Sequence, residues 1–469
     1  MILRFDPGQI DTFKQEIKSI PGYPTGEELP IQDLVFESNA LFRLPELLTA
    51  GRANLAHPLL VVMDHTPMRR GEADLKPLLV DVLQQSGWTP RPLWLEADAS
   101  GQVHTDFSQI EFVKAALNEN TAVLSVGSGV VTDVAKHACY LFEQEAHVHI
   151  PFIVYQTANS VSAYTSNMAP VFVEGVKRTL PSRYPDVLVC DLETLRDAPR
   201  EMTVAGVGDL LAAFSSFADW YLAYRLGLDP SYTEFAQILL GPLDDIFLAY
   251  APALREGTLD SMEVLAKLIS LAGIAMSLSH ATAPLSGFEH VISHVLDLLA
   301  EQEHQPLAQH GTQVALATLL STASYQKFLT AFEPDEVNLA GCYPSSNQMK
   351  KQIETAFASI DPSGKVAREC WSDYEQKLTA WHANRLLFEA FLRDWPNIRT
   401  TLEQLTRPPG FVMKLLRAID SPVRFDQLSP PVEMDRVKFA YFNAPLIRKR
   451  LTLGDLFIFL DWDREALWD

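Results

Sequence analysis

The amino-acid sequence predicts an α/β domain with a doubly wound parallel sheet, followed by a helical domain. Up to about residue 190, short apolar runs alternate with helix-like segments, a pattern typical of buried parallel strands joined by helices. Beyond that point long helical patterns dominate. The 469 residues are too many for one small core, and about 100–200 residues per domain favours at least two domains. We therefore predict domains at residues 1–190 and 191–469.

The predicted strands of the first domain are short apolar runs of the kind that a buried parallel sheet requires. They lie at residues 59–64, 92–95, 121–126, 149–155 and 187–190. Amphipathic stretches at 71–87 and 108–117 predict helices between the first three of them. Alternation within 169–181 around Glu174-Gly175 predicts a β-hairpin. This order implies an open, doubly wound sheet.

The second domain is predicted to be helical because long apolar patterns follow one another with few strand-like runs. Helices are predicted at 209–226, 261–278, 288–299 and 313–328. Residues 340–469 continue the helical pattern, with breaks at Pro408-Pro409 and Pro430-Pro431.

Composition narrows the possible functions. The chain has 38 Lys and Arg against 59 Asp and Glu, and its formal net charge of −21 disfavours binding to nucleic acid or anionic membranes. A local basic patch could still hold one small phosphorylated ligand. No apolar run approaches the roughly 20 residues that span a bilayer, and the first residues lack a signal-peptide pattern. The four cysteines form no CxxC pair, so we expect no disulfides, no thiolate zinc site and a cytoplasmic location.

A glycine turn between a predicted strand and a predicted helix is the first candidate binding segment. Gly127, Ser128 and Gly129 follow the strand at 121–126, and a helix begins at once. Glycines let the backbone approach a pyrophosphate, and a helix N-terminus offers free N–H groups to an anion. The spacing differs from the GxGxxG fingerprint, however, and a tight turn without a ligand explains it equally well.

A small polar loop, residues 157–166, directly follows the predicted strand at 149–155. In open α/β sheets ligands bind beyond the carboxyl ends of the strands, so this loop is well placed for a site. A solvated loop is the alternative. Because the loop is poor in charge and rich in hydroxyls, we favour a functional role.

One carboxylate and several imidazoles suggest a metal site. Asp209 follows Gly206-Val207-Gly208 and is expected to open an apolar helix. His290 and His294 are spaced i, i+4 on one helical face, and His310 opens another helix. Such a set suits a divalent metal. For each residue taken alone, a capping aspartate or an ordinary helical histidine is the commoner explanation.

Six segments form a recognisable set along the chain. They are the turn Gly127–Lys136, the hairpin residues Lys177–Pro181, the run Ala198–Trp220, Ser286–His294, His310–Val314 and the tail Ala444–Thr452. In order and spacing they resemble the iron-containing alcohol dehydrogenase and dehydroquinate synthase superfamily, and within it the sn-glycerol-1-phosphate dehydrogenases. The resemblance runs from about residue 35 to the end. It implies a dehydroquinate synthase-like fold, with a Rossmann-like sheet domain before a helical domain.

The resemblance implies a particular metal site. Asp209, His290 and His310 would be the ligands, and His294 would lie beside the metal and the substrate as a catalytic proton carrier. Three ligands leave a position open for substrate or water, which suits zinc, with nickel or iron as alternatives. Some relatives add a histidine ligand where this chain has Ala213.

The resemblance also implies an NAD or NADP cofactor on the α/β domain. Its expected contacts are Gly127, Ser128, Gly129, Asp133, Lys136, Thr157, Ser160 and Ser166. Asp64 ends the strand at 59–64, where relatives hold an acid that reaches the adenosine ribose. A carboxylate there accepts from the 2′-hydroxyl and repels a 2′-phosphate, so we expect NAD over NADP.

Ser162 is the position at which the sequence departs from this family. Relatives place an aspartate there, against the nicotinamide and the substrate hydroxyls. A serine keeps a hydrogen-bonding group but loses the charge. We include Ser162 among the catalytic candidates, and the substitution leaves substrate identity and turnover open.

The function implied by the resemblance is hydride transfer, in a cleft between the two domains, between a nicotinamide and a polyol phosphate. The expected pair is sn-glycerol 1-phosphate with dihydroxyacetone phosphate, or a close relative. Two alternatives remain: a dehydroquinate synthase-like sugar-phosphate cyclase, disfavoured by Asp209 and by the scarcity of lysines in the helical domain, and an NAD- and metal-binding protein without turnover. Relatives are commonly dimers or larger, and the apolar run Leu456–Leu460 supports a homo-oligomer.

Overall fold

The computed structural model describes residues 3–98, 101–173 and 176–468 of the chain. Contacts within the chain group these residues into two compact units. Unit 1 comprises residues up to Val173, Lys177–Val207 and Glu234–Leu278, and unit 2 comprises mainly Gly208–Thr233 and the residues from Ser279 onward. The limits of the two units are defined by contacts within the chain and do not test the domain boundary after residue 190, which stays a prediction.

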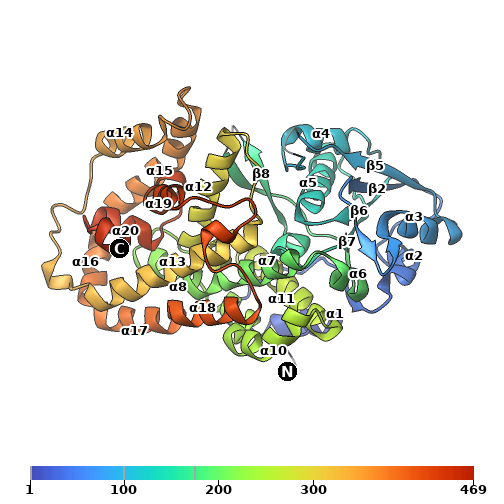
Figure 1. Ribbon diagram of the computed structural model, residues 1–469, viewed down its shortest axis with the longest axis horizontal. Coiled ribbons are helices and arrows are strands. Elements are labelled where there is room, and N and C mark those ends of the chain that lie inside the picture. Colours follow the sequence, from blue (N-terminus) through green and yellow to red (C-terminus); the bar gives the residue numbers. More distant parts are fainter. Residues whose placement is uncertain (1–2, 99–100, 174–175, 469) are drawn as a thin grey trace. The chain divides into compact units, whose positions relative to one another are not determined.

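Unit 1 contains a six-stranded sheet in which every pair of neighbouring strands is parallel (Figure 1). In spatial order the strands are β1 (Asp33–Glu37), β10 (Val187–Asp191), β7 (Phe152–Gln156), β6 (Ala122–Gly127), β2 (Leu59–Asp64) and β5 (Pro90–Leu95). The five predicted strands are confirmed. β1 was not predicted, because only three apolar residues stand there between Asp33 and Glu37.

Helices cover both faces of this sheet, as the doubly wound prediction requires. α2 (Ala40–Ala50) and α3 (Leu75–Gln85) share a buried apolar cluster with alternate residues of β2, which are Leu59, Val61 and Met63. α5 (Gly129–Ala146) packs against β6, β2 and β7 and contributes no residue to that cluster. Since successive strand side chains point to opposite faces, the buried Leu60 and Val62 face the other layer.

The direction of the chain connections reverses between β2 and β6. After β2 the chain passes to β5 at one edge, and after β6 it passes to β7 on the other side. Asp64 and Gly127 are the last residues of these two neighbouring strands. Open α/β sheets bind ligands beyond the carboxyl ends of the strands at such a reversal.

Other parts of unit 1 also bear on the predictions. β8 (Met168–Val173) and β9 (Val176–Pro181) form a separate two-stranded sheet, while the predicted turn at Glu174-Gly175 lies outside the described residues. Among the described residues, one helix, α11 (Leu259–Leu278), is long and apolar enough to cross a membrane. This finding corrects the expectation that no apolar segment approaches that length. The apolar window of α11 is 89% buried inside the structure, as is usual for a core helix. The remaining helices of this unit are α1 (Ile10–Ile17), α4 (Phe107–Lys114), η1 (Ser162–Thr165), α6 (Leu192–Asp197), α9 (Phe235–Leu240) and α10 (Leu243–Glu256).

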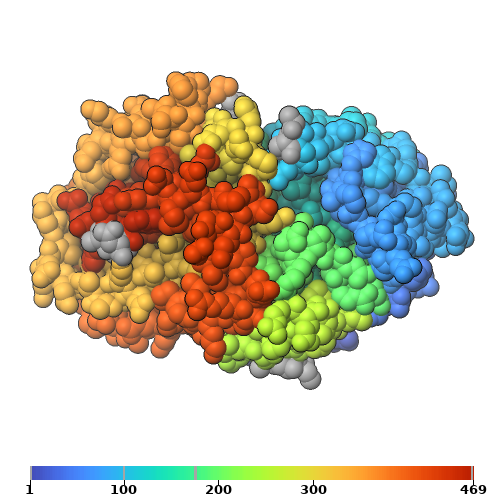
Figure 2. Space-filling view, viewed as in Figure 1, coloured from blue at the N-terminus to red at the C-terminus, as the bar shows by residue number. Residues whose placement is uncertain are grey.

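From Gly208 onward, the regular secondary structure of unit 2 is all helical within the described residues, and the orange and red C-terminal residues make up much of its visible surface in Figure 2. The predicted helices appear as α8 (Ala213–Arg225), α12 (Phe288–Gln302) and α13 (His310–Ala331). The other helices are η2 (Ala283–Leu285), η3 (Pro334–Glu336), α14 (Ser346–Phe357), α15 (Lys365–Ala383), α16 (Arg385–Arg393), α17 (Trp395–Leu405), α18 (Pro409–Ala418), η4 (Phe425–Gln427), α19 (Met434–Asn443), η5 (Ala444–Ile447), α20 (Leu453–Phe459) and α21 (Arg464–Trp468).

The prediction that Asp209 opens a helix is wrong. Asp209 lies near the end of α7 (Arg200–Leu211), and the division between the two units falls within this helix. The glycines before it serve packing. A Cβ atom on Gly208 would lie 2.2 Å from the carbonyl oxygen of Gly311, so this glycine lets α7 and α13 approach closely.

Candidate functional site

The three predicted metal ligands lie together in unit 2. Asp209 comes from the end of α7, His290 from the first turn of α12, and His310 is the first residue of α13. One potential ligand atom from each lies within 4.8 Å of the others. His290 Nε2 is 3.4 Å from Asp209 Oδ1, and both residues are less than a tenth exposed. Three donors from three helices therefore converge on one point.

His290 is oriented by the residue that precedes it. The Nδ1 atom of His290 lies 3.2 Å from Oε1 of Glu289, which is fully buried. Glu289 also accepts hydrogen bonds from the Ser215 hydroxyl at 2.7 Å and from the Gly287 backbone N–H at 2.5 Å. Burial lowers the pKa of the His290 imidazole, but Asp209 and Glu289 outweigh that effect and raise the pKa to about 8. The Nε2 atom of His290 thus points toward Asp209, while its Nδ1 atom contacts Glu289.

His310 has its own supporting group on α12. Its Nδ1 atom lies 3.4 Å from the Ser293 hydroxyl and 4.0 Å from Oδ2 of Asp297. The Gln313 amide donates to the Ser293 hydroxyl at 2.8 Å and to Asp297 Oδ1 at 3.0 Å. Because ligand histidines usually bond a second group through the ring nitrogen that faces away from the metal, such contacts are expected around a metal centre.

His294 lies beside the predicted ligands. Its ring is stacked against His310, with centroids 5.9 Å apart, and its centroid is 6.1 Å from that of His290. Nη2 of Arg448 lies 3.2 Å from Nδ1 of His294. A guanidinium only donates, so Nδ1 accepts and the proton of the neutral ring is on Nε2. Sequence reasoning found His294 but missed Arg448, which is 154 residues away in the chain.

The residues of this cluster fit a divalent metal. One carboxylate and two imidazoles are the donor types that zinc and related ions take at three-ligand catalytic centres. A divalent ion held by these three donors would keep coordination positions for a substrate oxygen or water.

The glycine turn in unit 1 ends β6 and begins α5. A Cβ on Gly127 would lie 2.5 Å from Cβ of Val131, and one on Gly129 would lie 2.5 Å from a methyl carbon of Val161. Ser128 stands at the N-cap position of α5 and its side chain makes no capping bond. The two glycines are therefore needed for the protein's own packing, which brings the loop 157–166 against the start of α5.

Asp133 and Lys136, both predicted as cofactor contacts, lie beneath that loop. Nζ of Lys136 is 2.7 Å from Oδ1 of Asp133 and donates to the Ala163 carbonyl at 2.9 Å. The Lys136 side chain is fully buried. The structure thus places this pair where it supports the loop, and direct contact with a cofactor stays a prediction.

The loop itself is well ordered by internal contacts. Ser160 and Tyr164 hydroxyls are 3.2 Å apart, and the Ser166 hydroxyl accepts from the Met168 N–H at 3.1 Å. Thr157 is buried like Ser160 and Ser166. Ser162 is partly exposed and begins the short helix η1. Of the predicted loop residues, Ser162 is therefore the one whose side chain is more accessible to solvent.

Asp64 lies where the reversal of the sheet predicts a ligand, but it is already engaged. Nζ of Lys76 lies 2.8 Å from its Oδ1 atom, and the Thr66 hydroxyl donates to Oδ2 at 2.7 Å. The lysine partly neutralises the carboxylate. The repulsion of a 2′-phosphate by Asp64 is therefore weaker than the sequence argument assumes.

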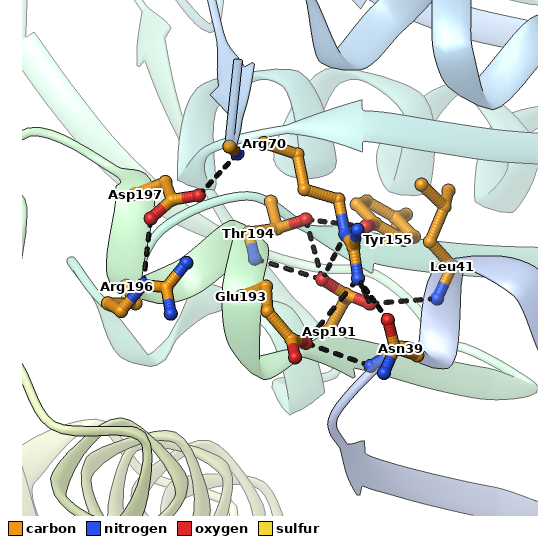
Figure 3. A network of polar contacts seen from close by, with 10 residues as sticks. Asn39, Leu41, Arg70, Tyr155, Asp191, Glu193, Thr194, Arg196 and Asp197 are labelled. Atoms are coloured by element: carbon orange, nitrogen blue, oxygen red, sulfur yellow. Dashed lines mark hydrogen bonds and ion pairs between the residues drawn. The ribbon is translucent and has the colours of Figure 1, made fainter. Parts of the chain in front are cut away.

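A partly buried ionic network at the carboxyl ends of β10 and β1 was not predicted from sequence (Figure 3). Arg70 Nε lies 2.9 Å from Oδ1 of Asp191, the last residue of β10, and Arg70 Nη2 donates to Asn39 just after β1. Asp191 also accepts from the Leu41 N–H and from Thr194. Arg70 and Asp191 are 121 residues apart, so no local motif signals their pairing. The network fixes the segment around Arg70 to this edge of the sheet.

Residues 35–199 match the family model described as iron-containing alcohol dehydrogenase. The chain is a relative of the iron-containing alcohol dehydrogenases. It is 29% identical over 339 residues to a glycerol-1-phosphate dehydrogenase of Bacillus velezensis. The aligned region covers 72% of this chain and 80% of that enzyme. The chain is 27% identical over 402 residues to the Bacillus subtilis enzyme of the same name, covering 86% and 85%. Both are named as NAD(P)+ enzymes.

Two solved structures share the fold of this chain. The structure of a probable glycerol dehydrogenase from Sinorhizobium meliloti superposes with a TM-score of 0.52 and 16% sequence identity. The match covers 93% of this chain and 96% of the Sinorhizobium chain. A 2-epi-5-epi-valiolone synthase from Streptomyces hygroscopicus, solved with NAD+ and Zn2+, matches 94% and 99%, with a TM-score of 0.50 and 14% identity. The predicted combination of a sheet domain and helices in a dehydroquinate synthase-like fold is confirmed.

Proposed function

We propose that this protein is a metal-dependent, NAD(P)-linked dehydrogenase that acts on a polyol phosphate. The best candidate pair is sn-glycerol 1-phosphate and dihydroxyacetone phosphate. The observation that carries the proposal is the convergence of Asp209, His290 and His310 within 4.8 Å, in a relative of glycerol-1-phosphate dehydrogenases. Metal-bound cyclases share the fold, so the reaction itself has to be tested.

Each residue of unit 2 has a defined task under this proposal. Asp209, His290 and His310 hold a divalent ion, with zinc preferred over nickel or iron. When bound, the ion supplies Lewis-acid polarisation of the substrate oxygen and NAD(P) exchanges the hydride. Glu289 fixes the orientation of the His290 ring. His294 carries the proton that leaves or reaches the substrate hydroxyl, since its ring lies beside both ligand histidines.

Unit 1 supplies the cofactor site under the same proposal. The N-terminus of α5, which begins at Gly129, would hold the pyrophosphate, and Asp64 would contact the adenosine ribose. Thr157, Ser160, Ser162 and Ser166 lie in the loop that follows β7, next to this helix start. The domain boundary after residue 190, a homo-oligomer and a cytoplasmic location also belong to the proposal. The run Leu456–Leu460 does not support the oligomer, because Leu456, Phe457 and Phe459 are buried within the single chain.

The test is a substrate panel with purified protein stripped of metal by a chelator and then reloaded. We expect reduction of NAD with sn-glycerol 1-phosphate after addition of zinc, nickel or iron, and much weaker activity with its sn-3 enantiomer or with glycerol. Ring closure of a sugar phosphate without net reduction of NAD would replace the dehydrogenase by the cyclase. Binding of NAD and metal without turnover on any polyol phosphate would refute both.

A further inference from the structure

The C-terminal segment Ala444–Thr452 carries three consecutive basic residues, and each has a different environment. Lys449 is exposed. The Arg450 guanidinium donates to the carbonyl oxygen of Ser286 and to the Thr282 hydroxyl. Arg448 is partly buried and reaches the ring of His294. Of these three cations, Arg448 is the one that contacts a histidine of the candidate site.

The segment around Arg448 is fixed from two sides. Nζ of Lys377 in α15 is buried and donates to the carbonyl oxygens of Pro445 at 2.6 Å and Arg450 at 3.3 Å. Arg450 in turn holds Ser286, which stands just before α12. Since α12 carries His290 and His294, these contacts tie the segment to the helix of the candidate site. The place of Arg448 beside His294 is therefore built into the packing of unit 2.

The chemistry of the contact favours an anion as the partner of Arg448. A guanidinium presents five N–H donors in a planar fork that matches the oxygens of a phosphate. A neutral imidazole offers a single acceptor, whereas a phosphate monoester offers several acceptors and up to two negative charges. A phosphate group arriving at this point would compete well for the guanidinium.

We propose that Arg448 recognises the phosphate group of the substrate. The proposal deepens, and rests on, the polyol phosphate dehydrogenase function proposed above. In a glycerol phosphate the reacting oxygen and the phosphorus are only a few covalent bonds apart. The residue that binds the phosphate must then lie close to the metal ligands, and Arg448 does so through His294, whose ring stacks on His310. When the guanidinium turns to the phosphate, it releases Nδ1 of His294.

The variant Arg448→Gln tests this assignment, with Lys449→Gln as the matched control and Arg448→Lys as a variant that keeps the charge but loses the fork. The protein is used with its metal bound. We expect kcat/KM for sn-glycerol 1-phosphate to fall about 100-fold in Arg448→Gln, and less in Arg448→Lys, and we expect this loss to exceed the loss in glycerol oxidation by about tenfold or more. Inorganic phosphate should raise the melting temperature of the wild type and of Lys449→Gln but not that of Arg448→Gln. Metal content should be equal in all four proteins.

Each other outcome has a definite meaning. An equal loss on sn-glycerol 1-phosphate and glycerol would show that Arg448 only positions His294, and would overturn the proposal. Unchanged kinetics and unchanged stabilisation by phosphate would also overturn it while leaving the dehydrogenase function standing. If the wild type oxidised no glycerol phosphate but still bound inorganic phosphate in a manner dependent on Arg448, the phosphate site would be supported and the proposed reaction would fail. If Arg448→Gln did not fold, Arg448→Lys would be the deciding variant. If inorganic phosphate raised the melting temperature of Arg448→Lys as much as that of the wild type, the proposal that the guanidinium fork recognises the phosphate would be overturned.

Discussion

Replacing Glu289 by glutamine tests whether the carboxylate that contacts Nδ1 of His290 orients this histidine for metal binding. Glu289 is fully buried and accepts three hydrogen bonds, from His290 Nδ1, the Ser215 hydroxyl and the Gly287 N–H. Glutamine has nearly the same shape and can keep its oxygen toward His290 Nδ1 and the Gly287 N–H, because the Ser215 hydroxyl on the other side can accept from the NH₂ group. The substitution therefore removes the negative charge without leaving a cavity.

The expected magnitude follows from these contacts. Loss of a charged group behind a ligand histidine typically lowers metal affinity about 10–100-fold. That range corresponds to about 1.4–2.7 kcal/mol of binding free energy. We expect Glu289→Gln to weaken zinc binding within this range, because the His290 ring loses its negatively charged partner.

The assay is competition between the metal-free protein and a chromophoric chelator, at one pH and over a range of zinc concentrations. Glu303→Gln is the control, because Glu303 follows the same helix α12 at its far end and is exposed. The control should bind zinc like the wild type. Equal zinc affinity in Glu289→Gln and wild type would refute the argument that Glu289 orients a ligand.

Four further predictions follow from the same structure. His310→Ala should lose most of the about one metal ion per chain expected in the wild type, measured by elemental analysis; full occupancy in the variant would contradict the ligand assignment. Ser162→Asp should change kcat/KM on sn-glycerol 1-phosphate about tenfold or more with a nearly unchanged melting temperature, because the side chain is partly exposed in the loop after β7; unchanged kinetics would remove Ser162 from the site. Lys377→Met should destabilise the fold by about 3–5 kcal/mol in urea unfolding, since it leaves the fully buried Asp455 carboxylate, 2.6 Å from Lys377 Nζ, without its cation; a smaller loss than about 1 kcal/mol would contradict this. Isothermal titration should show tighter binding of NAD than of NADP, and Asp64→Asn should narrow the difference; tighter NADP binding by the wild type would remove the argument from Asp64.

Sequence reasoning worked best where one local signal decides the structure. The apolar runs of β2, β6, β7 and β10 are short and lie between helix-like segments, which favours buried strands, and all four were predicted. The i, i+4 spacing of His290 and His294 likewise places both rings on one face of α12 regardless of the rest of the chain. β1 escaped detection because its three apolar residues give too short a signal, although it completes the edge of the sheet next to β10.

The same reasoning failed where one residue type serves two structural purposes. The sequence predicts that the apolar helix opens at Asp209, directly after Gly206 and Gly208. In the structure both lie inside α7 at points where another backbone passes within the reach of a Cβ atom. The position of Asp209 relative to His290 and His310 was therefore predicted through the resemblance, and the local helix prediction contributed nothing to it.

The residues that contact and orient the site histidines were the hardest to predict from sequence, because most of their partners lie in distant parts of the chain. Glu289 precedes a predicted ligand but was not recognised, since its contact with Ser215 is known only from the packing of α8 against α12. Arg448 is 154 residues from His294, and the contact depends on Lys377 holding the intervening backbone. A metal-ligand triad can thus be proposed from motifs, whereas the supporting contacts that would set metal affinity and substrate choice depend on how the helices of unit 2 pack. The variants of Glu289 and Arg448 are therefore the sharper tests of the proposed function, because they test interactions that the motifs alone do not predict.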